Sequence, residues 1–588
     1  MEEKRTVIWV GALGLLVLSV ILFLASKVFQ GLSFEKEPKT GVSSPVELGK
    51  PRHSSNRPEQ SGDGTGLAFT GLVLDLLRQR LEGLGVLDHE ALLRFKDEEA
   101  YQAFLRRAKG AGLRVLDRMD KLNAVRIGYD DLNALVDDYR NNRDDYGEIG
   151  SNYQVRIPGI PENRQAQVEV PFGGSALSWL GIQGDTSQWG TGTTIAILDS
   201  GVENHAAFGQ GQVRSIDLSP GVDPAVAADG GEVTDGAFGH GTAVASIVAG
   251  SNPSMLGVAP AANILDIKIT GADGLSDSFT LAKAIIEAVD LGADVVNISL
   301  GSYGDSTLVR DAVAYATNVG AVIVAAGGND TYNQLSFPAR YEDVVSVGAV
   351  DAEGQQLSFS NSGEGLDLTA PGLEVMAAWP NETGDGLISF TGTSASAPFV
   401  SGSIAAVMSV FPGTTAAEAV QLLEAYSNEA GAAGADPAFG DGILDVGRAV
   451  QSTTPGITDV AVASHYVDLQ ALPKEGGATM DIVVENRGTT PLNNVELVIR
   501  SDNNDRTYSI PQIPVGEVAV RQFPIDTRLG EAQGQLQFSS QVTIPGVNDA
   551  NVADNARTSV LVFPEAATAA GDGSSASSGA ESAGGAGP

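Results

Sequence analysis

The sequence predicts an α/β fold built on a mostly parallel, doubly wound sheet, with a small α+β domain before it and an all-β sandwich after it. Between residues 192 and 450, continuous apolar runs alternate with helical periods, which is typical of a parallel sheet covered on both faces. Before this region, strand-like runs alternate with two helical patterns. After it, short alternating strands are separated by turn signals, as in a sandwich.

The composition indicates a folded protein and excludes several kinds of partner and site. The chain has 588 residues, of which 43% are hydrophobic, so most of it can form packed cores. Its formal net charge of -37 argues against binding to nucleic acid or to an anionic lipid surface, since both require a basic surface. It contains no cysteine, which excludes disulfides, thiolate metal sites and a cysteine nucleophile.

The N-terminal segment predicts a membrane helix. Thr6 to Ser26 contains no charged residue, and about 20 apolar residues span a bilayer core. Lys4 and Arg5 precede it, which favours a cytoplasmic N-terminus. We therefore expect a signal anchor at residues 1–30 that places the rest of the chain outside the cytoplasm, in the periplasm or at the cell exterior. A cleaved signal peptide is the alternative, although its apolar region is usually shorter.

Residues 31–88 are expected to form a linker, and residues 89–160 a compact α+β domain. The first part of the linker is rich in Ser, Gly and Pro. The domain that follows has the predicted order β-α-β-α-β. The expected elements are strand 92–95, helix 98–108, strand 113–127, helix 130–139 and strand 150–157.

Residues 170–455 carry the predicted parallel sheet. Helices are expected at 281–291 and 306–319, each stopped by a glycine, and at 397–410. In such a sheet ligands bind at the carboxyl ends of the strands. The expected strands are 194–198, 264–269, 295–298, 321–326 and 344–350.

The C-terminal part divides into a predicted β-sandwich at 458–566 and a tail at 567–588. The tail consists largely of Gly, Ala and Ser and is expected to be disordered. The expected strands of the sandwich are 480–484, 495–499, 536–543 and 558–563.

Amide hydrolysis by an alcohol needs a nucleophile, a base, a group that orients the base and hydrogen-bond donors for the oxyanion. Asp199 follows a buried strand, which would place its carboxylate at the edge of the sheet. His240 opens a segment of small residues that can pack rigidly as a helix, and the chain has only 5 histidines. His205 is the rival base, but it lies in a polar turn and is better interpreted as structural.

Ser394 precedes the predicted helix at 397–410, and a helix N-terminus offers free N–H groups. A simple helix cap is the alternative, and Ser396 is a rival nucleophile. Asn329 follows another predicted strand, and its amide could donate to an oxyanion.

In the order Asp199, His240, Asn329, Ser394, these residues resemble the subtilisin-like serine proteases, the subtilase family. The resemblance runs from about residue 175 to about residue 450. The flanking segments that agree are Trp179–Ile182, Ser299–Gly301, Phe337–Tyr341 and Ala370–Gly372.

The resemblance implies a role for each residue. Asp199 would orient the imidazole, and His240 would act as general base and then as acid. Ser394 would be the nucleophile, and Asn329 would form the oxyanion hole with the Ser394 N–H. A protein or peptide substrate would pair as a strand with the chain and place a side chain in a pocket. The implied substrate-binding residues are Ser299, Leu300, Gly301, Ala326 and Gly328.

The chemistry requires no cofactor. An acidic insert between Asp199 and His240 could hold structural calcium, although a solvated loop is the favoured interpretation, and the metal ligands stay unknown. Its acidic residues are Asp217, Asp223, Asp229, Glu232 and Asp235.

The flanking domains also carry resemblances. Residues 92–158 resemble the inhibitory propeptide of the family, which implies autocleavage between Pro158 and Ser175. The sandwich resembles CARDB-type extracellular modules, from Asp459 through Asn486-Arg487-Gly488 to Asp554-Asn555. Two function classes follow: an extracytoplasmic endopeptidase made as a zymogen, or a catalytically silent scaffold that binds surfaces through the sandwich. The sequence leaves the oligomeric state open.

Overall fold

The computed structural model describes residues 85–160, 169–220, 238–271, 273–468, 478–501, 504–526, 528, 530 and 533–562. The predicted anchor at 1–30, nearly all of the linker at 31–88 and the tail at 567–588 lie outside the described residues. All described residues fall within one unit, Gly66–Pro588.

The first described domain is a four-stranded antiparallel sheet with two helices, in the sheet order β2-β3-β1-β4. The prediction of a single strand over 113–127 is wrong. A short 3-10 turn, η1 (Asp120–Leu122), and a left-handed Asn123 (φ 50°) split this stretch into a hairpin, so the order is β-α-β-β-α-β. The elements are β1 (Glu90–Phe95), α3 (Glu98–Arg107), β2 (Leu113–Met119), β3 (Ala124–Tyr129), α4 (Leu132–Asn141), η2 (Arg143–Asp145) and β4 (Tyr146–Gly150).

Local sequence explains both helices of this domain. The carboxylate of Asp97 accepts a hydrogen bond from the N–H of Ala100, and Asp131 caps α4 in the same way through Asn133. The buried faces of the helices carry Tyr101, Phe104 and Leu135, which pack on the sheet. The domain therefore has a hydrophobic core of its own.

The central sheet has seven parallel strands in the order β15-β14-β13-β12-β6-β10-β7. Its fold class is the predicted one, and most strands lie within a residue or two of their predicted bounds. The strands are β6 (Thr194–Asp199), β7 (Val213–Asp217), β10 (Asn263–Lys268), β12 (Val295–Ile298), β13 (Val322–Ala326), β14 (Val344–Val350) and β15 (Leu368–Pro371).

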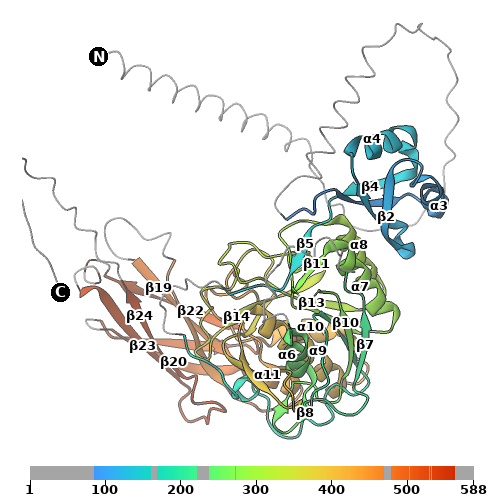
Figure 1. The fold of residues 1–588 in the computed structure, drawn as a ribbon. Helices are drawn as coiled ribbons and strands as arrows, with labels where there is room; N and C mark the ends of the chain where they lie inside the picture. Colours follow the sequence, from blue (N-terminus) through green and yellow to red (C-terminus); the bar gives the residue numbers. More distant parts are fainter. Residues whose placement is uncertain are drawn as a thin grey trace, which may run out of the picture. The chain divides into compact units, whose positions relative to one another are not determined.

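Helices cover both faces of this sheet (Figure 1). The helices α6 (His240–Ala249) and α9 (Thr393–Val410) pack against each other in one apolar core. The helices α7 (Ser278–Asp290) and α8 (Thr307–Asn318) pack in the second core. The apolar character of α9 reflects this burial, since 83% of the helix lies inside the protein.

The strand order places a ligand site at a defined edge. The chain starts the sheet at β6, adds β7 and β10 on one side, and then adds β12 to β15 on the other. The reversal occurs next to β6, and ligands of such sheets bind beyond the carboxyl ends of the strands at this point. Smaller elements of this domain are α5 (Ala176–Trp179), β8 (Ser251–Asn252), β9 (Met255–Leu256), β16 (Val375–Ala378), β17 (Leu387–Phe390), α10 (Ala416–Ala425) and α11 (Val446–Gln451).

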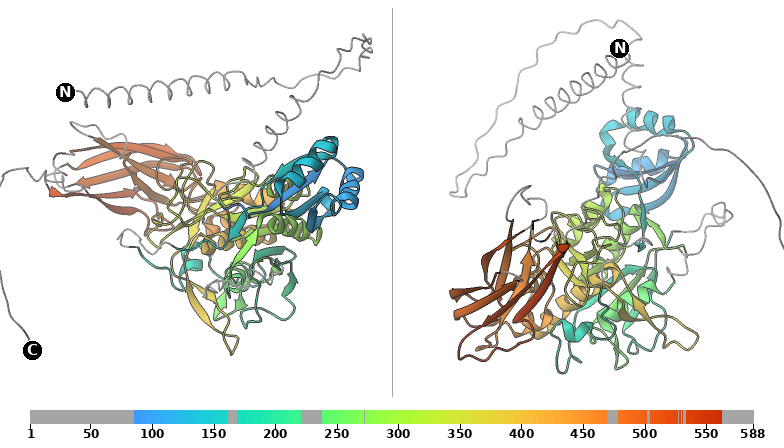
Figure 2. Two further views of the ribbon diagram at one scale, coloured as in Figure 1. Left: turned by 45° about the horizontal axis from the view of Figure 1, so that its top comes forward. Right: turned by 90° about the vertical axis from the view of Figure 1, so that its left-hand side faces the viewer.

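The C-terminal domain consists of two antiparallel sheets whose inner faces share one apolar core, and Figure 2 shows these strands in orange and red. The sequence predicts four strands, and the structure adds β18, β21 and β22. The strands are β18 (Val460–Tyr466), β19 (Ala478–Asn486), β20 (Leu492–Ser501), β21 (Arg506–Ile513), β22 (Val518–Ile525), β23 (Gln535–Thr543) and β24 (Ala556–Val562).

Candidate active site

The carboxyl edge of the central sheet brings Asp199 and His240 together. Asp199 is the last residue of β6 and is fully buried, and His240 is the first residue of α6. The Nδ1 atom of His240 lies 2.8 Å from Asp199 Oδ1 and 3.0 Å from Oδ2, so the imidazole donates to the carboxylate. A carboxylate in this position fixes the tautomer that leaves Nε2 free to accept a proton.

Small residues let α6 approach the end of β6 this closely. A Cβ atom at Gly241 would lie 2.6 Å from the carbonyl oxygen of Gly201. The N–H of Gly241 donates to the hydroxyl of Ser200 (3.1 Å), which ties the helix to the turn after Asp199. The ring of Phe390 packs edge-on against the imidazole, with ring centroids 5.1 Å apart. The imidazole is therefore held on two sides.

Ser394 lies in the first turn of α9, and its side chain is buried. Its hydroxyl donates to the main-chain carbonyl of Ser299 (3.1 Å) rather than to the imidazole. The structure therefore joins two members of the predicted triad and directs the third to a strand-end carbonyl. A rotation about the Cα–Cβ bond of Ser394 is the movement that would redirect its Oγ.

The two rival residues have structural roles in this structure. The hydroxyl of Ser396 donates to the carbonyl oxygens of Ala370 and Pro371 inside the core. The ring of His205 is buried, with Nε2 2.9 Å from the Gly386 carbonyl and Nδ1 accepting the N–H of Ala207. Both side chains are therefore committed to holding loops.

Asn329 follows β13 and is oriented by Thr393, a residue that sequence reasoning missed. The N–H and the hydroxyl of Thr393 both donate to Asn329 Oδ1, at 3.0 and 2.9 Å. The Nδ2 group then donates to the carbonyl oxygen of Pro158 (3.2 Å). This amide donor thus faces a peptide carbonyl next to the start of α9.

The segment before Pro158 runs as a strand through the cleft. Strand β5 (Gln154–Arg156) pairs with β11 (Leu275–Asp277) in antiparallel register. On its other side, Arg156 exchanges both main-chain hydrogen bonds with Gly301, at 3.0 and 2.9 Å. The chain's own residues therefore make the strand pairing that the sequence predicts for a substrate.

A pocket of about 370 Å³ opens beside this strand, and Gly301 and Gly328 line it, together with Ser336. A Cβ atom at Gly328 would lie 2.3 Å from Asn361 Nδ2, so the glycine allows Asn361 to pack against this part of the pocket wall. Ser299 and Ala326 are not among its lining residues, and Leu300 packs into the second core of the sheet. Among the predicted substrate-binding residues, only the two glycines line the pocket.

The pocket also contains a polar cluster that the sequence did not reveal. The hydroxyl of Tyr303 donates to Asp330 (2.5 Å) and accepts from Asn361 Nδ2 (2.8 Å). Burial, and then the hydrogen bond to Asp330, raise the pKa of Tyr303 above its usual value. A guanidinium nitrogen of Arg156 lies 3.6 Å from Asp330. In the cleft, the carboxylate of Asp330 therefore faces the basic side chain of Arg156, which lies three residues before Gly159.

Most of the acidic insert considered for calcium, residues 221–237, lies outside the described residues. Asp217 is described, and its carboxylate accepts from the N–H and the hydroxyl of Ser219. These hydrogen bonds, the side-chain one first, lower its pKa. The carboxylate of Asp217 therefore makes hydrogen bonds typical of a turn, to a residue two positions further along the chain.

Comparison with known proteins shows which family this chain resembles. The model of the Subtilase family matches residues 190–442. Subtilisin BL from Lederbergia lenta is 35% identical over 265 residues, which are 45% of this chain and 92% of that protein. Alkaline elastase YaB from a Bacillus strain is 36% identical over 45% of this chain, and the match spans 65% of its length.

Two solved structures share the fold. Fervidolysin from Fervidobacterium pennivorans, described as a keratinolytic enzyme related to subtilisin, matches with a TM-score of 0.51 and 21% identity over 82% of this chain and 77% of its own. The epidermin leader peptide processing protease of Staphylococcus aureus matches with a TM-score of 0.50 and 22% identity over 62% of this chain and 99% of its own. With the match to subtilisin BL, these comparisons lead to one conclusion: the chain belongs to the subtilase family of serine proteases.

Proposed function

We propose that this protein is an extracytoplasmic serine endopeptidase that is made as a zymogen and processes itself. One observation carries the proposal: an amide donor, Asn329 Nδ2, holds the carbonyl of Pro158 at the sheet edge that also carries the Asp199–His240 pair and Ser394. Family membership supports the same reading.

Each residue has a defined task in the proposed reaction. His240, oriented by Asp199, takes the proton of the Ser394 hydroxyl as its Oγ attacks the substrate carbonyl carbon. The carbonyl oxygen gains negative charge, which Asn329 Nδ2 stabilises; losing such a donor typically costs about 2.7–4 kcal/mol. The protonated His240 then donates to the leaving amine, and water hydrolyses the acyl-enzyme by the same steps.

The proposed zymogen is cut at the bond between Pro158 and Gly159. The carbonyl of Pro158 is the one that Asn329 holds, and the strand pairing through Arg156 aligns the residues before it. An attack at this carbonyl would leave Gly159 as the new N-terminus. Residues 85–158 would then act as a cover for the cleft until they dissociate or are degraded.

The test compares two serine variants two residues apart. The chain with Ser394→Ala should neither hydrolyse casein nor release a fragment that begins at Gly159, as read by N-terminal mass spectrometry. Ser396→Ala is the matched control and should retain both activities, since its hydroxyl points into the core. A serine-directed phosphonate should block the unmodified protein and label it at Ser394.

Two results would count against this proposal. Cleavage of the Ser394→Ala chain at Pro158–Gly159 in the expression host would assign processing to another enzyme. An unmodified chain that fails to hydrolyse casein after release of residues 85–158 would favour the alternative of a catalytically silent binding scaffold.

We also propose that residues 1–30 anchor the precursor in a membrane, because they combine a long uncharged stretch with preceding basic residues. The Ser394→Ala chain should then stay with the membrane fraction after a carbonate wash. The processed enzyme should be released from that fraction. Recovery of the inactive chain in the soluble fraction would contradict the anchor.

A further inference from the structure

Three aspartates converge at one end of the sandwich, where they have no established role. One carboxylate oxygen from each of Asp459, Asp549 and Asp554 lies within 4.8 Å of the other two. Asp459 precedes β18, and the other two lie in the loop before β24. The stretches containing Asp459 and Asp554 are ones that the sequence analysis singled out but that the proposed protease function does not use.

Two of these carboxylates hold buried oxygen atoms without a hydrogen-bond donor. The side chain of Asp459 is buried, and its Oδ1 atom has no hydrogen-bond partner among the described residues. The Oδ1 atom of Asp554 is likewise buried without a partner, although its Oδ2 accepts from Arg487 (2.9 Å) and Asn551 (3.0 Å). Buried charges without partners are rare because the loss of hydration is costly.

Main-chain hydrogen bonds hold the cluster in place. The two oxygens of Asp549 accept from the N–H groups of Val460 and Asn551, both at 2.9 Å. A Cβ atom at Gly488 would lie 2.4 Å from the Ile457 carbonyl, so this glycine allows the segment before Asp459 to approach. The three carboxylates thus meet through contacts that do not depend on one another's charge.

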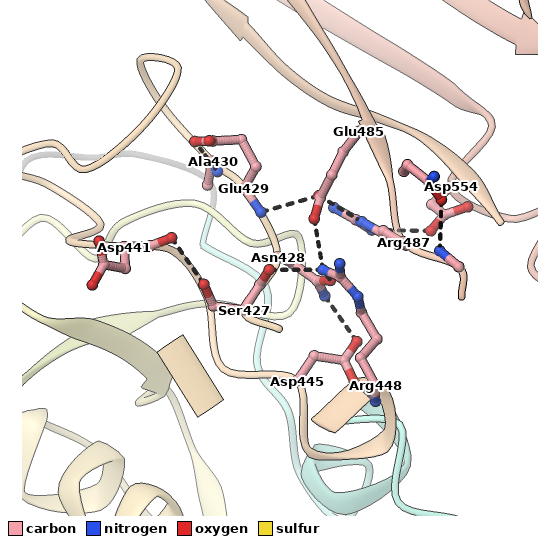
Figure 3. Close-up of polar contacts among 12 residues, drawn as sticks. Ser427, Asn428, Glu429, Ala430, Asp441, Asp445, Arg448, Glu485, Arg487 and Asp554 are labelled. Carbon is pink, nitrogen blue, oxygen red and sulfur yellow. Dashed lines mark hydrogen bonds and ion pairs between the residues drawn. The ribbon is translucent and has the colours of Figure 1, made fainter. Parts of the chain in front are cut away.

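The cluster continues into a network of buried charges that crosses to the protease domain (Figure 3). Arg487 pairs with Asp554 and with Glu485, and Glu485 accepts from Arg448 of α11 (2.6 Å). The carboxylates of this network, which also include Asp445 beside Arg448, outnumber its guanidinium groups.

We propose that Asp459, Asp549 and Asp554 form a binding site for a calcium ion that braces the sandwich where it joins the protease domain. Calcium prefers oxygen ligands at about 2.3–2.6 Å and accepts irregular geometries. A divalent ion would supply partners for the two bare Oδ1 atoms and cancel the excess charge.

The site is distinct from the acidic insert before His240, and variants separate the two. The full chain with Ser394→Ala, which removes the proposed self-digestion, is stripped with EDTA and titrated with CaCl₂ by calorimetry. Adding Asp459→Asn and Asp549→Asn should lower the stoichiometry by one equivalent. Asp505→Asn, at an exposed position before β21, is the matched control and should leave the stoichiometry unchanged. Equal stoichiometry in all three chains would overturn the proposal.

A second measurement uses no substitution in the cluster, so it tests the proposal even if the aspartate variants do not fold. Hydrogen exchange of the Ser394→Ala chain is followed with EDTA, CaCl₂ or MgCl₂. At a calcium concentration about 100 times Kd, the N–H groups of Val460 and Asn551 should exchange about 100-fold more slowly. Exchange at these two positions that is the same with EDTA and with calcium would overturn the site. Slowing by magnesium as strong as that by calcium would overturn its assignment to calcium.

Discussion

At the scale of single residues, the orientation of the Asn329 amide depends on Thr393. Thr393 sends two hydrogen bonds to Asn329 Oδ1, and Gly328 donates its N–H to the Thr393 hydroxyl (3.2 Å). If the amide turned over, its oxygen would face the carbonyl of Pro158 and repel the charge that develops there. Thr393 is therefore a positioning residue in the proposed reaction.

We predict that Thr393→Val lowers kcat about 10-fold and leaves KM nearly unchanged, since it removes about one hydrogen bond's worth of orientation. Asn329→Leu should lower kcat by about 100- to 1000-fold because the donor itself is lost. Steady-state kinetics on a chromogenic peptide measure both. Thr391→Val is the control, because the Thr391 hydroxyl accepts from Glu374 outside this cluster.

The double variant tests the mechanism of the effect. If Thr393 acts through the amide, Thr393→Val combined with Asn329→Leu should be no slower than Asn329→Leu alone. Additive losses would mean that Thr393 contributes by another route, and a rise in KM at constant kcat would mean that it acts in substrate binding.

The sequence predicts some residues of this site and not others for a physical reason. Asp199 and His240 stand out because each begins or ends a regular element with a clear local pattern. Thr393 and Asn361 act through contacts between segments that are distant in the chain, and nothing in their neighbours indicates those contacts. The turned-away hydroxyl of Ser394 is a rotamer, which no sequence pattern specifies.

At the scale of elements, main-chain hydrogen bonds on both edges hold β5 in the cleft. We predict that Arg156→Pro slows self-cleavage at Pro158–Gly159 at least about 10-fold, because proline lacks the N–H that donates to Gly301. A time course of fragment release after refolding measures the rate.

Arg156→Ala keeps this N–H and removes the guanidinium that faces Asp330, so it is the matched control. It should process at nearly the normal rate, because exposed ion pairs contribute little. If both variants processed equally slowly, the side chain of Arg156, and not its main-chain hydrogen bonds, would be what aligns the cleavage site. Normal processing of Arg156→Pro would contradict strand alignment altogether.

The predicted bounds of the strands are most accurate where burial on both faces gives a simple run of apolar residues. The strands of the central sheet are continuous apolar runs because both faces are covered, and β12 and β14 have their predicted bounds. In the sandwich, β21 and β22 were missed because each contains a proline, Pro511 or Pro524, which argues against a strand. The hairpin at 113–129 was missed because its turn contains neither glycine nor proline.

At the scale of the whole molecule, several buried carboxyl groups make stability depend on pH. Burial, followed by the charge of Asp367 for Glu424, raises the pKa of Glu424 and of Glu429 to about 7. Burial is also the largest cause that raises the pKa of Asp266 to about 6, and the charge of Asp199 adds to it. In the unfolded chain such groups titrate near their ordinary values, about 4.

The raised pKa values determine in which direction stability changes with pH. A raised pKa in the folded state contributes stability below the unfolded pKa, and this contribution is lost as the pH rises through the folded pKa. Glu485 opposes this at low pH, since Arg448 and Arg487 hold its pKa below the usual range despite its burial. Its contribution is lost as the pH falls. We therefore expect the Tm to be highest at about pH 4 to 5 and to fall as the pH rises to about 7, the pKa of Glu424 and Glu429 in the folded state.

One substitution isolates a single contributor. In the Ser394→Ala background and at a fixed calcium concentration, Asp266→Asn should raise stability at pH 8 by about 1–3 kcal/mol, because a buried carboxylate no longer has to ionise. The gain should vanish at about pH 3, where the carboxyl of Asp266 is largely protonated in both states. Scanning calorimetry at both pH values measures it, with Glu342→Gln at an exposed position as the control. A gain of equal size at both pH values would show that Asp266 affects stability through packing and not through its charge.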